Sequence, residues 1–279
     1  MKQKIFILNC LLIISFSTYS QNLNQSIQID KYETENGEKF TIHSHILNQD
    51  KEIFIGLPKN FNDSTNYPMI LVLEGEVVFE TFAPVTRLMA EVNEIPECIV
   101  VGIPFYNKHL EYAPKISQHP ESGNADKMLE FYSVELFPLL DSLYNCGKDR
   151  ILWSHSALGG IFCTYALLGP DRQFNGILSS SPSLKWMPDY VDKENAFEEL
   201  AKKDKVFYYL TFGSDEGDNY MGDMYDKVKK FKQRLEKEAP SNLIWKYQLN
   251  ENNNHLTNAL ETYSDGLILY FKEMNNYKR

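Results

Sequence analysis

Short runs of consecutive apolar residues recur along the chain, and each run ends in a polar or glycine-containing segment. Such runs are apolar at every position instead of every second one, which is typical of parallel strands covered on both faces of a sheet. The pattern predicts buried strands at residues 69–73, 98–103, 151–153, 176–178 and 206–210.

The segments 39–44 and 51–57 instead alternate between apolar and polar residues, which predicts half-buried antiparallel strands. Helical spacing of apolar residues lies between the later runs. Strand and helix therefore alternate, which predicts an α/β fold: a mostly parallel central sheet, antiparallel N-terminal strands and helices on both faces. The predicted helices cover residues 85–92, 125–144, 159–168, 221–238 and 263–274.

The N-terminus has the layout of a secretory signal peptide. Lys2 and Lys4 precede an apolar run at 5–16, and small or polar residues follow up to Ser20. We expect cleavage after Ser20, a single domain over 21–279, and export to a periplasmic or extracellular site. Cys10 lies inside the apolar run, which argues against a lipoprotein. No later stretch reaches about 18 apolar residues, so we expect no stable membrane insertion after signal removal.

The charge balance argues against a nucleic-acid partner. The chain has 28 Lys and Arg against 38 Asp and Glu, a formal net charge of −10. Phosphate backbones and anionic membranes attract clustered basic residues. The densest basic segment, 227–232, includes Val228 and Phe231, as expected for the solvated face of an amphipathic helix.

Cysteine and histidine usage predicts no metal site. Beyond the signal segment the chain has only Cys98, Cys146 and Cys163, without a C-x-x-C pair. Cys98 and Cys163 lie in apolar runs and are expected in the core. No His/Cys cluster has the spacing of metal ligands. We therefore expect no metal, and at most one disulfide.

Candidate catalytic residues follow the predicted strands. The segments 74–76, 154–160 and 211–217 come directly after apolar runs, and His255 follows the polar run 250–254. Ligands of such sheets bind at the carboxyl ends of the strands, so these segments are expected to meet. Their order is serine, then acid, then histidine, which is the order of an α/β-hydrolase triad.

That combination suits nucleophilic catalysis. A serine hydroxyl attacks an ester only when a histidine takes its proton, and a carboxylate holds that histidine in the required tautomer. A sharp strand-to-helix turn presents the serine and leaves backbone N–H groups to bind the oxyanion. The candidates are Ser156, His255 and either Glu216 or Asp215.

The turn departs from the usual G-x-S-x-G pattern. Around Ser156, the small Ser154 lies two residues before, but the bulky Leu158 lies two residues after. We expect Ser156 to act from a turn with one extra residue, absorbed by the glycines at 159–160, so that the helix start is displaced. Ser154 is the weakest candidate nucleophile.

A second alignment of the same turn remains open. Around Ala157, Gly159 lies two residues after but His155 lies two residues before, and alanine is no nucleophile. In that alignment the site has lost its serine.

Several stretches spread over the mature chain match one known family. They are Ile55-Gly56-Leu57-Pro58 with Tyr67 to Glu76, Ile95 to Pro104, Arg150 to Leu168, Ser181 to Trp186, and Asn254-His255 with Asp265-Gly266-Leu267. Together they resemble secreted α/β-hydrolase esterases, the group that includes siderophore trilactone esterases and S-formylglutathione hydrolases. Glu74 stands where the family usually has Asp.

The resemblance implies an α/β-hydrolase fold and roles for individual residues. His255 matches the catalytic histidine, and Glu216 matches the acid better than Asp215 does. The backbone around Gly75 and Glu76 matches one half of the oxyanion hole. The N–H group of Ala157 would supply the other half if Ser156 is the nucleophile. Trp186 is expected either to contact substrate or to pack in the core.

These inferences lead to two hypotheses. The first is a secreted serine carboxylesterase that hydrolyses a small-molecule ester without a metal or organic cofactor. The alternative is a catalytically lapsed relative that binds a ligand in the same cleft. Composition does not indicate which ester would be the substrate.

Overall fold

The computed structural model describes residues 30–34, 36–106, 111–117, 120–170, 173–216 and 222–277. The predicted signal peptide lies outside these residues, as do His109 and His119 in the loop that follows residue 104. Export and cleavage therefore stay predictions.

The described residues form one nine-stranded sheet in the order β1-β2-β3-β5-β4-β6-β7-β8-β9. The first three strands and the β3–β5 contact are antiparallel, whereas all pairings from β5 through β4 to β9 are parallel. The strands are β1 Asp30–Thr34, β2 Gly37–Ser44, β3 Gln49–Gly56, β4 Tyr67–Leu73, β5 Ile99–Ile103, β6 Cys146–His155, β7 Gly176–Ser180, β8 Val206–Gly213 and β9 Leu243–Asn250.

Every predicted strand is present, and the predicted α/β fold is confirmed. β1 and β9 are strands that the pattern did not predict. Both are edge strands of the sheet, and β9 has mostly exposed or half-buried positions. An edge strand needs no continuous apolar run, because one side and much of its faces meet water.

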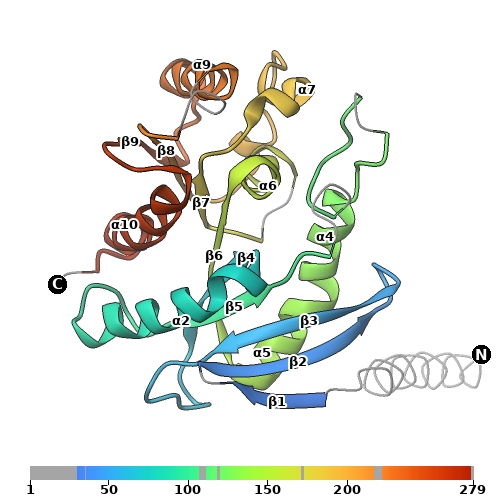
Figure 1. The fold of residues 1–279 in the computed structure, drawn as a ribbon, viewed down its shortest axis with the longest axis vertical. Helices are drawn as coiled ribbons and strands as arrows, with labels where there is room; N and C mark the ends of the chain where they lie inside the picture. The colour runs from blue at the N-terminus through green and yellow to red at the C-terminus, as the bar shows by residue number, and fades with distance from the viewer. Residues whose placement is uncertain are drawn as a thin grey trace, which may run out of the picture.

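Helices cover both faces of the sheet (Figure 1). α2 and α10 lie side by side on one face, where Thr86 Oγ1 and Tyr263 Oη are 2.6 Å apart. α4, α5, α6 and α9 pack against the other face. The helices are α2 Gly75–Glu91, α4 Ala125–Phe131, α5 Phe137–Tyr144, α6 Ser156–Leu168, α7 Pro188–Val191, α9 Asp223–Glu238 and α10 His255–Asn275.

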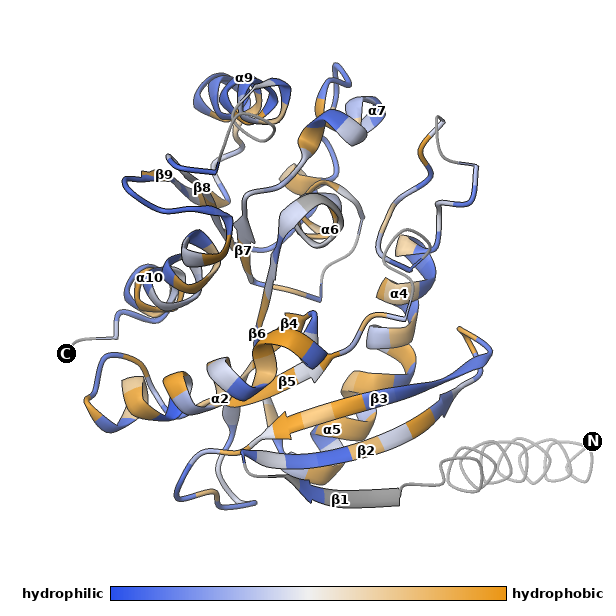
Figure 2. Cartoon of the chain, in the orientation of Figure 1, coloured by the Kyte–Doolittle hydropathy of each residue, from blue (hydrophilic) through white to orange (hydrophobic). Residues whose placement is uncertain are grey.

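The core has two layers, one on each side of the sheet. In β4 the residues Met69, Leu71 and Leu73 join the layer under α4 to α6, and Ile70 and Val72 join the layer under α2 and α10. The central strands carry the most hydrophobic residues, whereas α9 is mostly hydrophilic (Figure 2). Successive side chains of a strand point to opposite faces, so a strand buried on both faces needs apolar residues throughout.

Two helices begin earlier than predicted. α2 begins at Gly75 instead of residue 85, after Glu74 in a left-handed conformation with φ 63°. α10 begins at His255 instead of residue 263, because Asn254 caps it and forms a capping box with Thr257. The first turn of α10 is mostly polar, which hides the helical period there.

The predicted helix over 125–144 is interrupted by a π-helical turn, Tyr132–Leu136, between α4 and α5. Pro138 follows this turn in the first turn of α5. Proline has no N–H group and its ring clashes with the preceding turn, so the wider turn accommodates it. Glu135 in this turn accepts hydrogen bonds from Ser44 Oγ at 2.6 Å and His45 N at 2.9 Å, which ties the helix to the end of β2.

The expected displacement of the helix after β6 is wrong. α6 begins at Ser156 itself, directly after β6, so the turn holds no extra residue. The two glycines serve packing instead. A Cβ atom on Gly159 would lie 1.9 Å from Ser154 Oγ, and one on Gly160 would lie 2.7 Å from Pro182 Cα. The crowding that usually demands a glycine two residues after the nucleophile therefore falls three residues after Ser156.

This contact makes a prediction about stability. Gly159→Ala is expected to lower the free energy of unfolding by about 1–3 kcal/mol, because the new methyl group overpacks against Ser154. Adding Ser154→Ala removes the nearer clashing atom and is expected to recover most of the loss. Urea unfolding of both variants measures this. A Gly159→Ala protein as stable as the unmodified chain would contradict it.

Candidate active site

Ser156 lies in a strained turn at the carboxyl end of β6. Its φ is +71°, a left-handed conformation that costs a non-glycine residue about 1–3 kcal/mol. In the described chain, the residues with positive φ other than glycine and asparagine are Glu74, Ser156 and Ser181. They follow β4, β6 and β7, which are neighbours in the sheet. Backbone strain is therefore concentrated at this edge of the sheet.

Glu216, and not Asp215, contacts the candidate histidine. His255 Nδ1 lies 2.8 Å from Glu216 Oε2. The other carboxylate oxygen accepts hydrogen bonds from Gly213 N, at 2.7 Å, and from Ser181 Oγ. Asp215 is exposed, and its Oδ1 accepts a hydrogen bond from Ser214 Oγ at 2.9 Å. Of the two alternatives left open by the sequence, the structure brings Glu216 to His255.

The ends of β8 and β9 hold these two side chains together. The strands pair up to Gly213 and Asn250. The turns beyond them are then joined by hydrogen bonds from Ser214 N to Asn250 O and from Asp215 N to Asn253 O, both 2.9 Å long. A Cβ atom on Gly213 would lie 2.4 Å from Asn253 O, so the approach of the two turns requires glycine. The cap of α10 places His255 at the first helical position.

A buried hydrogen-bond network supports the acid, and sequence reasoning missed its members. Asn258 is fully buried, and its Nδ2 donates to Ser180 Oγ at 2.9 Å and to Ser181 Oγ at 2.7 Å. Asn258 Oδ1 accepts from Asn250 Nδ2 at 2.8 Å. Ser181 in turn donates to Glu216. A polar residue on the apolar face of α10 was the one sequence feature that could have pointed to Asn258.

A second acid and a second histidine lie beside this pair. His155 faces α2 and α10, and its ring centroid is 4.8 Å from that of His255. Its Nδ1 lies 3.6 Å from Glu74 Oε1. Because His155 immediately precedes Ser156, the ring contact brings the start of α10 to the candidate nucleophile. The sequence places His155 and Glu74 in segments that are expected to meet at the site, but it indicates no role for either side chain.

The N-termini of α2 and α6 lie next to each other at this site. Gly75 and Glu76 open α2, and Ala157 is the second residue of α6. The preceding strands β4 and β6 are neighbouring and parallel. N–H groups in the first turn of a helix have no acceptor within that helix and attract negative charge. A Cβ atom on Gly75 would lie 2.7 Å from the backbone of Gly102, so only glycine lets α2 begin this close to β5.

Trp186 lies farther along, in the short helical turn Leu184–Trp186. Its half-buried ring packs against the core layer that includes residues of α6 and α9, and Lys185 Nζ lies 5.4 Å from the ring centroid. Core packing, one of the two expected roles, is thus part of what this side chain does.

A cluster of metal ligands or a reactive thiol among the described residues would indicate a different chemistry. No group of three or more His, Cys, Asp and Glu side chains among them could hold a metal ion. Cys98, Cys146 and Cys163 are free and buried, and burial raises the pKa of the Cys146 thiol to about 12. In the part of the chain that the structure covers, no helix is long and apolar enough to span a bilayer.

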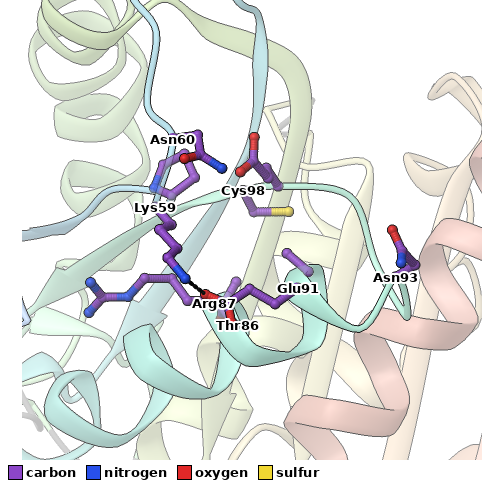
Figure 3. A pocket seen from close by; sticks show the side chains of 10 residues that line it. Lys59, Asn60, Thr86, Arg87, Glu91, Asn93 and Cys98 are labelled. Atoms are coloured by element: carbon purple, nitrogen blue, oxygen red, sulfur yellow. Dashed lines mark ion pairs between the residues drawn. The ribbon is translucent and has the colours of Figure 1, made fainter.

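A separate pocket lies at the opposite end of the sheet (Figure 3). Its volume is about 490 Å³, and its lining includes Pro58 just after β3 and Cys98 just before β5. Lys59 Nζ and Glu91 Oε1 form an ion pair 3.0 Å apart across it. In a mostly parallel sheet the carboxyl ends of the strands carry the site, so this pocket is not part of it.

Comparisons with known proteins agree with this geometry. The family model described as "Putative esterase" matches residues 44–263. The chain is 26% identical over 212 residues to the ferri-bacillibactin esterase BesA of Bacillus subtilis. The matched region covers 67% of this chain and 73% of that protein.

Two solved structures share the fold. The BES protein from Bacillus cereus superposes with a TM-score of 0.73 and 25% identity, over 88% of this chain and 98% of the other. An IroE-like serine hydrolase from Shewanella oneidensis gives a TM-score of 0.74 and 22% identity, over 88% and 80% of the two chains. Because the family model matches most of the chain, the protein belongs to this esterase family and is an ester-hydrolysing enzyme with the α/β-hydrolase fold.

Proposed function

We propose that the protein is a serine carboxylesterase in which Ser156 is the nucleophile, His255 the general base and Glu216 the acid that orients it. The observation that carries the proposal is the 2.8 Å contact between His255 Nδ1 and buried Glu216, next to a serine with φ +71°. A sharp turn of this kind exposes a serine hydroxyl at the top of an α/β-hydrolase sheet.

The proposed reaction has two halves. Ser156 Oγ attacks the ester carbonyl carbon while His255 takes the hydroxyl proton, and His255 then gives that proton to the departing alcohol. Water then attacks the acyl-serine while His255 takes a proton from it, and His255 gives this proton to Ser156 Oγ as the bond to the acyl group breaks and the acid leaves. Glu216 accepts a hydrogen bond from Nδ1 throughout. This contact fixes the tautomer of His255 and stabilises the imidazolium that forms in each half.

The oxyanion of each tetrahedral intermediate needs donors that are already in place. We assign this role to the N–H group of Ala157 and to the backbone at Gly75 and Glu76. Glu76 Oε2 accepts a hydrogen bond from Phe105 N at 3.1 Å, which holds the first turn of α2 against the segment after β5. The N-termini of α2 and α6, which follow neighbouring strands, would both direct partial positive charge at the oxyanion.

The substrate is proposed to be a small-molecule ester. The relative from Bacillus subtilis is named as an esterase of ferri-bacillibactin, so a siderophore ester is the first natural compound to test. The formal charge of −10 disfavours a nucleic-acid substrate.

The nucleophile generates the first prediction about activity. Ser156→Ala is expected to lower the rate of p-nitrophenyl ester hydrolysis by on the order of a million-fold. Ser154→Ala, the matched control in the same turn, is expected to keep most of the activity. An inert natural protein that gains hydrolysis on Ala157→Ser would contradict the proposal and favour the lapsed ligand-binding alternative.

The proposed role of Glu216 generates a second prediction about activity. Glu216→Gln is expected to lower kcat by about ten-thousand-fold, since the neutral amide no longer holds the histidine in the required tautomer. Asp215→Asn changes the neighbouring carboxylate in the same way and is expected to leave kcat within about twofold, because Asp215 is exposed and does not face His255. Steady-state kinetics of both variants decide between the two acids, and equal losses would reject the assignment.

The proposed signal peptide generates a prediction about export. The segment 1–20 is proposed to direct secretion, with a mature protein that begins at Gln21 and carries a formal charge of −12 once Lys2 and Lys4 are removed. N-terminal sequencing of the protein from the periplasm or medium checks this. A chain that starts at Cys10 would indicate a lipoprotein, and one that retains Met1 would indicate no processing.

A further inference from the structure

Glu74 and His155 form a buried acid–imidazole pair that the proposed mechanism does not use. Glu74 is 4% exposed and His155 is 7% exposed. Glu74 Oε1 lies 3.6 Å from His155 Nδ1, within ion-pair range. Neither ring nitrogen of His155 has a hydrogen-bond partner among the described residues. The carboxylate of Glu74 is therefore the charged group that lies against this buried ring.

The ring of His155 also lies in a group of aromatic rings that includes Trp153 and His255. Trp153, fully buried, lies nearly parallel to His155 with 6.0 Å between ring centroids. Phe82 and Tyr263 pack against Trp153 from α2 and α10. On the other side, His255 lies 4.8 Å from His155 at an interplanar angle of 44°. The orientation of the His255 ring therefore depends on the ring of His155. That ring packs against Trp153 in the core, and Glu74 lies near one of its nitrogens.

Among the described residues, carboxylates from different parts of the fold lie beside this ring pair. Glu74 precedes α2, His255 opens α10, and Glu216, which contacts His255, follows β8. A carboxylate in a poorly solvated site favours positive charge on nearby imidazoles. His255 gains such a charge at each proton transfer. Glu74 therefore favours the same protonated state that Glu216 favours, from the opposite side of the ring pair.

We propose that Glu74 is a positioning residue for ester hydrolysis: it holds the imidazole of His155, which forms the wall that His255 lies against, and its charge supports the protonated form of His255. The inference rests on the proposed role of His255 as general base. Glu74 touches no reacting atom in this account and acts through His155.

The test compares pH profiles of kcat/KM. Glu74→Gln keeps the shape of the side chain and removes its charge, so the acidic limb is expected to move to lower pH by roughly 0.5–1 unit. Glu74→Asp keeps the charge and is expected to restore most of the limb. Glu91→Gln, at the other end of the same helix, is the matched control and is expected to leave the profile unchanged. A Glu74→Gln profile that superimposes on the unmodified one overturns the proposal.

Positioning is tested separately from charge. His155→Phe keeps a flat ring in the stack but cannot engage Glu74, and it is expected to lower kcat roughly tenfold with KM nearly unchanged. The double variant with Glu74→Gln is expected to be no worse than either single variant, because both changes break one unit. If Glu74→Gln fails to fold, His155→Phe alone tests the positioning role. A kcat of His155→Phe equal to that of the unmodified protein then rejects the proposal.

NMR spectra of the His255 ring separate this inference from the proposed function. The ring resonances of His255 are expected to shift in Glu74→Gln whether or not the enzyme turns over. Such a shift together with full activity of Ser156→Ala would retain the effect of Glu74 and reject the proposed nucleophile. Activity that depends on Ser156 together with unchanged His255 resonances would retain the esterase and reject the role of Glu74.

Discussion

The buried carboxylate of Glu216 is the group on which the architecture of the site depends. A buried charge is unfavourable unless hydrogen bonds and an opposite charge compensate it. Here the compensation comes from Gly213 N, Ser181 Oγ and His255 Nδ1. Those partners come from the ends of β8 and β7 and from the start of α10, so the carboxylate holds three separate elements in one arrangement. Asn258 extends the same network to the end of β9.

Strain on the other side of the site is offset by packing. Ser156 and Glu74 adopt left-handed conformations at the ends of adjacent strands. Tight glycine contacts surround them: Gly159 lies against Ser154, Gly160 against Pro182 and Gly75 against β5. Such strained residues persist only where the surrounding structure determines their conformation. The two-layered core around β4 and β6 supplies that constraint, and α2 and α6 begin from it with their N–H groups at one edge of the sheet.

The sequence predicted most of the sheet, because strands buried on both faces must be apolar throughout. It also predicted the order of serine, acid and histidine along the chain, since these residues follow the predicted strands. It missed both edge strands, β1 and β9. In β9 the short apolar run Leu243-Ile244-Trp245 gives way to alternating residues, most of them exposed or half-buried. The starts of α2 and α10 were also placed too late. The start of α2 follows the left-handed conformation of Glu74, which the apolar pattern does not indicate. The start of α10 has a local signal, the capping box of Asn254 with Thr257, that the apolar pattern alone does not register. The sequence also did not indicate the contact between Glu74 and His155, because these residues are distant in the chain. Only the family resemblance favoured Glu216 over Asp215 as the acid. The packing of Gly159 against Ser154 explains how the turn at Ser156 forms without the usual second glycine.

The central claim is that Ser156 is an activated nucleophile. The most direct measurement is to treat the folded protein with a fluorophosphonate and to locate the adduct by peptide mass spectrometry. A serine beside a working base reacts covalently, whereas other serines stay inert. We expect one adduct, on Ser156, that is lost in His255→Ala. No labelling of the folded protein, or an adduct on Ser154, would contradict it.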